Sequence, residues 1–536
     1  TTMGRTKYIF VTGGVTSSLG KGIISASIGK LLQSRGYSVT NQKFDPYLNV
    51  DPGTLNPYEH GECYVTADGH QTDLDLGHYE RFTSVETCRN NSFTTGRIYQ
   101  NVINKERKGE YEGRTVQIIP HITDEIKKNV LYFGKKNKFD FVITEIGGVA
   151  GDIESLPFLE SVRQLKWELG QDCLIVHLTY VPYLAAAKEL KTKPTQHSVK
   201  KLQELGIQPD VLVLRTEHDI NQEMRDKVSL FCNVSKDAVI QSKDVPSIYE
   251  VPLRMQRQNL DSIILRKVGL NPEDTTSDLS KWTSFLDRMY SATEKVNIAL
   301  VGKYVELQDA YKSIHEALLQ ACVYNDRKLN LISIQSANLT EENIAEQLGG
   351  VDGILIAPGF GRRGVEGKVL AAKFARENNI PTLGISLGMQ CMVVDFARNV
   401  LGIKDANSTE VNPQTENKVI DPMASLKDIN DVEGAMRLGA YECELAEGTK
   451  SAEAYGTTFI AERHNHKNEF NNAYKEQFEK AGMKFAGINP EMGLVEIIEL
   501  PEHKWYVGTQ FLPEYRSSVE KPHPLFVNFI KASITK

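Results

Sequence analysis

The feature that most constrains this chain is a glycine-rich turn that directly follows an apolar run near the N-terminus. The run is Tyr8–Phe10, and the turn contains Gly13-Gly14 and then Gly20-Lys21-Gly22. A glycine-rich turn between a buried strand and a helix directs backbone N–H groups and the positive end of the helix at one point, and Lys21 adds a full charge. The pattern therefore predicts a cradle for a triphosphate.

This turn departs from the common phosphate-loop pattern in two ways. Five residues separate Gly14 from Gly20, where the pattern has four, and Gly22 stands where Ser or Thr is usual. A flexible strand-to-helix turn without a ligand is the alternative interpretation. Because Gly22 has no hydroxyl, other oxygen ligands must hold the magnesium ion that accompanies a nucleoside triphosphate.

Length and composition narrow the class of protein. A chain of 536 residues is too long for one core, so we expect about two to four domains. The net charge of −7 gives no reason to expect nucleic-acid binding. Seven cysteines without the paired spacings of zinc sites indicate a reduced, cytoplasmic protein. No apolar run is long enough to cross a bilayer, so we expect neither a membrane partner nor a nucleic-acid partner.

Apolar strands alternate with helical stretches in both halves of the chain, which predicts an α/β fold with two tandem three-layer domains and mainly parallel sheets. The predicted domains are 1–266 and 296–536, joined by a linker over 267–295. A polar segment over 407–431 lacks apolar periodicity and predicts a surface lid or mobile loop. The predicted strands are 38–44, 139–146, 174–179 and 211–214 in the first half and 296–301, 331–334, 353–357, 382–385, 494–498 and 505–511 in the second.

Three carboxylates and one basic segment are candidates for binding a metal ion and a substrate. Glu145 closes an apolar strand before paired glycines, as a ligand-binding residue does. Asp73 and Asp75 are candidate magnesium ligands, with a solvated strand edge as the alternative. Lys191–His197 is predicted to be a loop, because Pro194 disfavours helix at the residue before it. It is either a clamp for a second phosphate-bearing substrate or a solvated surface.

Several motifs, in order, resemble the synthase (amidoligase) domain of the CTP synthase family over residues 3–265. They are Gly13–Gly22, Lys43–Tyr47, Glu59–Glu62, Asp73–Arg81, Pro120–Thr123, Gly151–Ser155 and Lys191–His197. The resemblance implies a ligase reaction in which ATP phosphorylates the uracil 4-oxygen of UTP, ammonia displaces that phosphate, and CTP results.

The same resemblance implies roles for single residues. Lys21 and Lys43 are the implied catalytic lysines, and Asp75 and Glu145 the implied Mg²⁺ ligands. The implied ATP-binding residues are Ser18, Leu19, Gly20, Lys21, Gly22 and Asp75. The implied UTP- and CTP-binding residues are Ser17, Asp152, Ile153, Glu154, Lys191, Thr192, Lys193, Pro194, Thr195, Gln196 and Lys227. Val149 departs from the family threonine, which removes a hydroxyl near Glu145.

The second half resembles a class I glutamine amidotransferase over residues 296–535. The motifs are Ala357–Gly361, Pro381–Gln390, Asn407–Glu410 and Gln510–Tyr515. The implied glutamine-binding residues are Gly359, Leu387, Gly388, Met389, Gln390, Glu410 and Lys467. Where the family has its nucleophilic cysteine this chain has Ser386, and where it has a histidine this chain has Leu512, while Glu514 is retained.

These departures predict that glutamine hydrolysis is lost or very weak. A serine hydroxyl needs a general base, Leu512 cannot accept a proton, and Glu514 then has no imidazole to orient. Lys467 replaces an arginine and lacks its bidentate fork. His464 and His466 are the alternative bases. We therefore expect an ammonia-dependent amidoligase, to which glutamine can bind without turnover.

Two other functions remain open. The first is a nucleotide-binding regulatory or assembly subunit of the same family, motivated by Val149 and the altered triad. The second is a different phosphate-loop ligase, such as a dethiobiotin-synthetase-like enzyme, which leaves the second domain unexplained. The family resemblance also implies a homotetramer, feedback inhibition by CTP and GTP as an allosteric effector.

Overall fold

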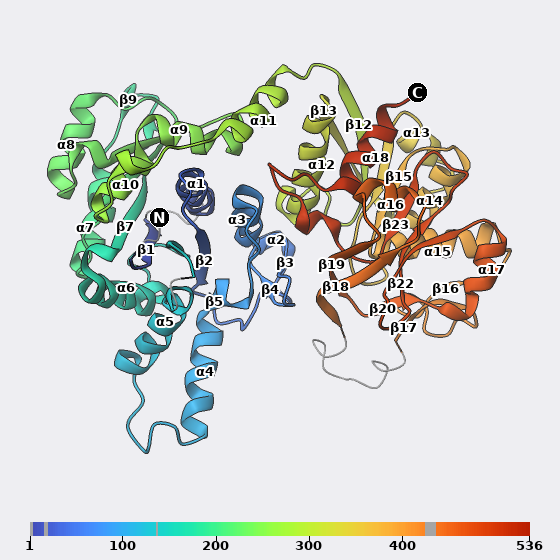
Figure 1. The fold of residues 1–536 in the computed structure, drawn as a ribbon, viewed down its shortest axis with the longest axis horizontal. Helices are drawn as coiled ribbons and strands as arrows, with labels where there is room; N and C mark the ends of the chain where they lie inside the picture. Colours follow the sequence, from blue (N-terminus) through green and yellow to red (C-terminus); the bar gives the residue numbers. More distant parts are fainter. Residues whose placement is uncertain (1–3, 15–19, 136–137, 424–435) are drawn as a thin grey trace. The chain divides into compact units, whose positions relative to one another are not determined.

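A computed structural model describes residues 4–14, 20–135, 138–423 and 436–536 (Figure 1). Contacts divide the chain into two compact units, one of residues 1–54 and 75–283 and one of residues 55–74 and 284–536. Residues 55–74 thus belong to the second unit, although they precede most of the first in sequence. The domain limits at 266 and 296, with a linker over 267–295, stay a prediction.

The first unit is built on a seven-stranded parallel sheet in the order β11-β10-β7-β1-β6-β2-β5. Its strands are β1 (Lys7–Gly13), β2 (Val39–Asp45), β5 (Ser92–Thr94), β6 (Phe141–Ile146), β7 (Cys173–Tyr180), β10 (Val211–Thr216) and β11 (Val239–Lys243). A short hairpin is formed by β8 (Tyr183–Leu184) and β9 (Glu189–Leu190). Because the sheet strands are parallel, their carboxyl ends meet at one edge, where ligands bind in such folds.

Helices cover both faces of this sheet. The helices are α1 (Lys21–Ser34), α3 (Asp75–Thr83), α4 (Thr95–Arg107), α5 (Thr123–Val130), α6 (Leu156–Leu169), α7 (Lys193–Glu204), α8 (Gln222–Cys232), α9 (Val251–Arg257) and α10 (Leu260–Lys267), with α11 (Ser280–Ser291) following. Tyr8 and Phe10 of β1 enter one apolar core with Phe158 of α6. Side chains alternate along a strand, so Ile9 and Val11 face the opposite layer, where α1 contacts β1, β2 and β6.

The second unit is built on a nine-stranded mixed sheet in the order β13-β12-β14-β15-β23-β22-β21-β18-β19. The first five strands are parallel and the others antiparallel. The strands are β12 (Lys295–Gly302), β13 (Lys328–Gln335), β14 (Gly353–Ile356), β15 (Thr382–Ile385), β18 (Arg437–Leu445), β19 (Phe459–His466), β21 (Lys484–Ile488), β22 (Val495–Glu499) and β23 (Tyr506–Thr509). Separate small sheets contain β3 (Tyr64–Val65) with β4 (Gln71–Thr72), and β16 (Asn407–Ser408) with β17 (Lys418–Pro422) and β20 (Asn468–Phe470).

This sheet also lies between two helical layers. The helices of the unit are α2 (Pro57–His60), α12 (Lys312–Tyr324), α13 (Ile344–Leu348), α14 (Val365–Glu377), α15 (Leu387–Asn399), α16 (Lys450–Tyr455), α17 (Lys475–Lys480) and α18 (Pro524–Ile534). Val301 and Ile356 form a core with Met389 of α15, while α18 contacts β12, β14 and α12. The predicted α/β class, with two three-layer units and mainly parallel sheets, is confirmed.

Two predictions about local structure are wrong, at least in part. Helix α7 begins at Lys193, so the predicted loop over 191–197 ends there, because a proline in the first helical turn loses no hydrogen bond. The predicted lid over 407–431 contains β16 and β17, since Val419 and Ile420 are buried against other apolar residues. Residues 424–431 of that prediction lie outside the described part of the chain.

Among the helices that the structure describes, none combines the length and the apolar composition needed to cross a membrane.

Candidate active sites

The turn predicted to bind a triphosphate lies at the carboxyl end of β1. Gly20, with a φ of 85°, precedes α1, and the predicted residues Ser17, Ser18 and Leu19 lie outside the described residues. The Lys21 side chain folds back over Gly13, where a Cβ atom would lie 2.8 Å from Lys21 Cδ. Its ammonium donates hydrogen bonds to the carbonyls of Ile146, at 3.0 Å, and Gly148. Glycine at position 13 therefore makes room for the lysine.

The presence of glycine at position 22 is explained by a close contact with another side chain. A Cβ atom at this position would overlap the Asp75 carboxylate, which reaches the first turn of α1 from the start of α3. A serine or threonine could not fit here without moving that carboxylate. Asp75 thus takes the space in which the common phosphate-loop pattern places a hydroxyl.

One lysine joins the carboxylates at this edge of the sheet. Lys43 Nζ pairs with Asp75 Oδ2 and lies 3.6 Å from Asp45 Oδ1 and 3.7 Å from Glu145 Oε2. Tyr79 donates its hydroxyl to Glu145 Oε1. Burial, together with the negative charge of Asp75, raises the pKa of Glu145, and burial lowers the pKa of Lys21. The side chains of Lys43, Asp75 and Glu145 are 10%, 18% and 3% exposed, so the cluster concentrates charge where little solvent reaches it.

The donor set of this cluster fits magnesium. Asp75 and Glu145 supply hard oxygen ligands beside Lys21, and Mg²⁺ commonly uses one or two protein carboxylates together with phosphate and water. In the described ranges no group of three or more His, Cys, Asp or Glu side chains is arranged to hold a metal ion. Asp73, the other candidate, lies between β4 and α3.

The residues predicted to bind UTP lie in segments that follow β6, β7 and β10, and so share the carboxyl edge of the sheet. Asp152, Ile153 and Glu154 are exposed after β6, and Lys227 is exposed on α8. Residues 191–196 lead into α7, where Thr192 and Thr195 are buried. The Thr195 hydroxyl lies 2.8 Å from that of Thr179, so part of this segment is fixed to β7.

In the second unit, Ser386 occupies a sharp turn between β15 and α15. Its φ of 53° and ψ of −106° are unusual for a residue with a side chain. Gly388 makes the turn possible, because a Cβ atom there would overlap the Ile356 carbonyl. Such an elbow presents a nucleophile at the end of a strand in several hydrolase families. Among the described residues, the hydrogen-bond partner of Ser386 Oγ is the Gln510 amide, at 3.5 Å, which donates and cannot take a proton.

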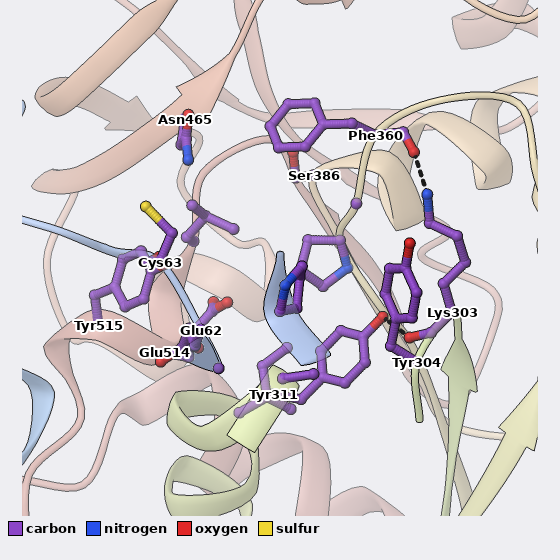
Figure 2. A pocket seen from close by; sticks show the side chains of 17 residues that line it. Glu62, Cys63, Lys303, Tyr304, Tyr311, Phe360, Ser386, Asn465, Glu514 and Tyr515 are labelled. Carbon is purple, nitrogen blue, oxygen red and sulfur yellow. Dashed lines mark hydrogen bonds between the residues drawn. The ribbon is translucent and has the colours of Figure 1, made fainter. Parts of the chain in front are cut away.

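A cavity of about 230 Å³ lies at this elbow. Figure 2 shows Ser386, Asn465 and Glu514 around it, with Lys303 donating a hydrogen bond to the Phe360 carbonyl. The lining residues are Pro57, Gly61, Glu62, Cys63, Lys303, Tyr304, Ala310, Tyr311, Ile314, Pro358, Gly359, Phe360, Ser386, Asn465, Leu512, Glu514 and Tyr515. The sequence pattern identified Gly359, Ser386, Leu512 and Glu514. It did not assign Tyr304, Tyr311, Pro57 or Cys63 to this site, and it placed the motif Glu59–Glu62, which contains Gly61 and Glu62, in the synthase resemblance instead.

Glu514 is a buried acid without its expected partner. Its Oε1 atom has no hydrogen-bond partner in the described part of the chain, and Leu512 lines the cavity beside it. Burial, with the charges of Glu62 and Glu462, raises the pKa of Glu514 well above its ordinary value of 4.5. Burial therefore favours the protonated, uncharged form of this carboxyl group in the folded chain.

We expect Glu514→Gln to flatten the pH dependence of stability. The unfolded chain releases the Glu514 proton near pH 4.5 while the folded chain retains it, so stability from this group is complete below that pH and falls as pH rises towards the folded pKa. The loss amounts to at most about 1.4 kcal/mol per pH unit. Thermal unfolding at pH 5 and pH 8 measures it, with exposed Glu479→Gln as the charge-matched control. Equal pH slopes in wild type and Glu514→Gln would contradict this.

The alternative bases His464 and His466 are buried and paired with each other. His466 Nδ1 donates to the Asn468 carbonyl at 3.1 Å, so its Nε2 accepts from His464 Nδ1 at 2.7 Å. His464 Nε2 lies 2.7 Å from Glu496 Oε2. Because side chains alternate along β19, Asn465 lines the cavity and the two histidines face away from it. Neither histidine is therefore placed to act as a general base for Ser386.

The other predicted glutamine-binding residues occupy several positions. Leu387, Gly388, Met389 and Gln390 are buried in the first turn of α15. Glu410 accepts hydrogen bonds from the Gly361 N–H at 2.9 Å and from Asn468 Nδ2 at 3.1 Å. Lys467 is exposed at the turn between β19 and β20. The turn at Ser386 thus lies at the cavity, whereas Lys467 lies at the surface.

The fold and the two sites define a two-unit protein in which a phosphate-loop α/β unit with a lysine–carboxylate cluster is joined to a unit of the class I glutamine amidotransferase type. A family profile described as "CTP synthase N-terminus" matches residues 7–270, and one described as "Glutamine amidotransferase class-I" matches residues 306–532. The chain belongs to the CTP synthase family.

The similarity to curated relatives extends over the whole chain. The protein named CTP synthase in Porphyromonas gingivalis W83 is 66% identical over 99% of this chain and 98% of its own length. The protein of that name in Bacteroides fragilis NCTC 9343 is 66% identical over 100% of both. Among solved structures, the glutaminase domain of Trypanosoma brucei CTPS with bound acivicin is 34% identical, covers 45% of this chain and 94% of that chain, and gives a TM-score of 0.43.

Proposed function

We propose that this chain converts ATP, UTP and ammonia into ADP, phosphate and CTP, through UTP phosphorylated on its 4-oxygen. The single observation that carries the proposal is the interlocked set of Lys21, Lys43, Asp75 and Glu145 at the carboxyl edge of the first sheet. Support also comes from relatives named CTP synthase over the full length of the chain.

In this proposal, the residues of the first unit act by position and charge. Lys21 and the N-terminus of α1 hold the ATP phosphates, and Lys43 offsets charge on the phosphoryl group as it moves to UTP. Asp75 and Glu145 would hold Mg²⁺, which supplies further charge neutralisation when bound. Phosphorylation turns the carbonyl oxygen into a leaving group, so ammonia attacks C4 and phosphate departs.

The residues after β6, β7 and β10 hold the pyrimidine nucleotide in the same proposal. Asp152–Glu154, Lys191–Gln196 and Lys227 present donors and acceptors at the edge where the phosphate loop lies. ATP as co-substrate, Mg²⁺, feedback inhibition by CTP, a GTP effector, a homotetramer and a cytoplasmic location belong to this proposal as properties implied by the family resemblance.

We further infer that ammonia is taken up directly and that glutamine hydrolysis is lost or very weak. Ser386 contacts an amide donor, Leu512 lines the cavity, and Glu514 has an unpartnered oxygen among the described residues. The two nearby histidines face away from the cavity. Glutamine can still enter this site, but the described lining residues offer no imidazole to take the proton of Ser386.

The test is CTP formation from ATP, UTP and magnesium with ammonium or glutamine as the nitrogen source. We expect the rate with ammonium to exceed that with glutamine at least about a hundredfold, because an acyl transfer without its base loses most of its catalysis. Comparable rates would overturn the inference about glutamine. Product with neither source would favour a nucleotide-binding subunit, with Val149→Thr as the first variant to try.

A further inference from the structure

A buried chain of hydrogen bonds crosses the first unit directly behind the phosphate loop. Thr12 Oγ1 lies 2.7 Å from His177 Nδ1, and His177 Nε2 lies 2.8 Å from Ser198 Oγ. The exposed fractions of the three residues are 1%, 0% and 5%. Both ring nitrogens of His177 are therefore engaged by buried hydroxyl groups.

The three residues come from the elements that carry the two proposed nucleotide sites. Thr12 is followed by Gly13-Gly14 of the phosphate loop, and it pairs in register with His177 on β7. Ser198 lies on α7, which begins inside the segment 191–196 proposed to bind UTP. His177 is thus the link between the ATP side and the UTP side of the site.

The contact between α7 and the phosphate loop is close. A Cβ atom at Gly14 would overlap Ser198 Oγ, so this hydroxyl lies directly against the loop backbone. The Gly14 N–H donates to the Leu178 carbonyl at 3.0 Å, which fixes the loop to β7. A shift of α7 would therefore displace the backbone at Gly14.

A second link binds β7 to α7 alone. Thr179 and Thr195 share a hydrogen bond of 2.8 Å and are both fully buried. His177 and Thr179 lie two apart on the strand and Thr195 and Ser198 three apart on the helix, so each pair shares a face. The seam between β7 and α7 is therefore polar at two successive positions, and His177 alone extends it to β1.

His177 keeps one protonation state in the folded chain. Burial, with the positive charge of Lys21, lowers the pKa of His177 to about 3. A neutral imidazole donates through one nitrogen and accepts through the other, and hydroxyl groups can meet either role. The hydrogen-bond chain is thus complete at neutral pH without a change of charge.

We propose that His177 is a positioning residue that holds Gly13-Gly14, at the start of the phosphate loop, and the segment 191–196 in one register, so that ATP and UTP meet in reacting geometry. This inference rests on the proposed function, since it takes these two segments as the nucleotide sites. His177 itself touches neither nucleotide in this proposal. It acts through Thr12 on one side and Ser198 on the other.

Two substitutions of His177 distinguish its hydrogen bond to Thr12 from its hydrogen bond to Ser198. His177→Asn keeps a polar atom near the Nδ1 position and so retains the Thr12 contact, whereas His177→Gln reaches the Nε2 position and retains the Ser198 contact. We expect His177→Asn to raise the Kd of UTP by about tenfold with little change for ATP, and His177→Gln to do the reverse. Titration calorimetry of the full chain with UTP, and separately with a non-hydrolysable ATP analogue, measures both constants.

Controls distinguish positioning from general destabilisation. Ser161→Ala removes a buried hydrogen bond of 2.8 Å to the Pro157 carbonyl on α6, and it should lower the melting temperature without splitting the two affinities. If the His177 variants do not fold, Thr12→Val and Ser198→Ala should give the same split in milder form.

The outcomes bear on the two proposals differently. Equal weakening of both nucleotides in both variants, or unchanged affinities, would overturn the positioning role while leaving the proposed function intact. A wild-type chain that binds neither nucleotide would overturn the proposed function and, with it, this inference.

Discussion

The double substitution Ser386→Cys with Leu512→His is expected to raise glutamine-dependent CTP formation by on the order of 10³-fold. The elbow already holds position 386 at the strand end with the required backbone angles. A histidine at position 512 would place an imidazole beside Glu514, whose Oε1 has no partner among the described residues. That imidazole would deprotonate the thiol and accept orientation from the carboxylate.

The single substitutions should recover little, because nucleophile and base act as a unit. Cysteine alone has no base, and histidine alone faces a weak nucleophile. The assay measures CTP formed with glutamine, and the rate with ammonium serves as the internal control because it depends on the first unit. A double variant with no more glutamine-dependent activity than wild type would contradict the view that these two positions silence the site.

Replacing Lys21 by methionine is expected to lower CTP formation by about 10³-fold with either nitrogen source. Methionine keeps an unbranched chain of similar length to cover Gly13, but it removes the charge that we propose faces the ATP phosphates, together with the hydrogen bonds to Ile146 and Gly148. The rate with ammonium measures the loss. Exposed Lys236→Met removes one positive charge elsewhere in the same unit and should leave the rate near that of wild type.

A melting temperature within a few degrees of wild type would show that Lys21→Met remains folded. Near-normal CTP formation by a folded Lys21→Met chain would remove the phosphate loop from the mechanism and contradict the proposed function.

The sequence was sufficient to predict the α/β class and the strands that carry the sites. Runs such as Phe141–Ile143 are apolar because both faces of a parallel strand are covered, and glycines follow the strand ends. Lys43 and Glu145 lie near the ends of such strands, and Lys21 and Asp75 begin the helices α1 and α3. A parallel sheet gathers those ends at one edge, so their proximity follows from topology.

What the sequence did not reveal depends on contacts between distant segments. Tyr304 and Tyr311 line the second cavity from a segment without a recognised motif, and Glu62 lines it from a motif that resembles the synthase domain. The orientation of His464 and His466 away from the cavity follows from the alternation of β19, which has too few apolar residues for its period to be recognised. The prediction of a loop around Pro194 is wrong because a proline is compatible with the first turn of a helix, where the residue before it can also be helical.

In this chain a glycine at position 22 and a carboxylate at position 75 replace the hydroxyl residue of the common phosphate loop, and this pairing bears on how phosphate sites are searched for in sequences. In the proposed function, the oxygen that a loop serine would supply comes instead from Asp75 of α3, more than fifty residues later, and the glycine at position 22 leaves the space that this carboxylate occupies. The two positions are thus expected to evolve as a pair, since any side chain at position 22 would overlap the Asp75 carboxylate. A search pattern that demands the hydroxyl will overlook such proteins, whereas one that pairs an empty position with a remote acid will find them.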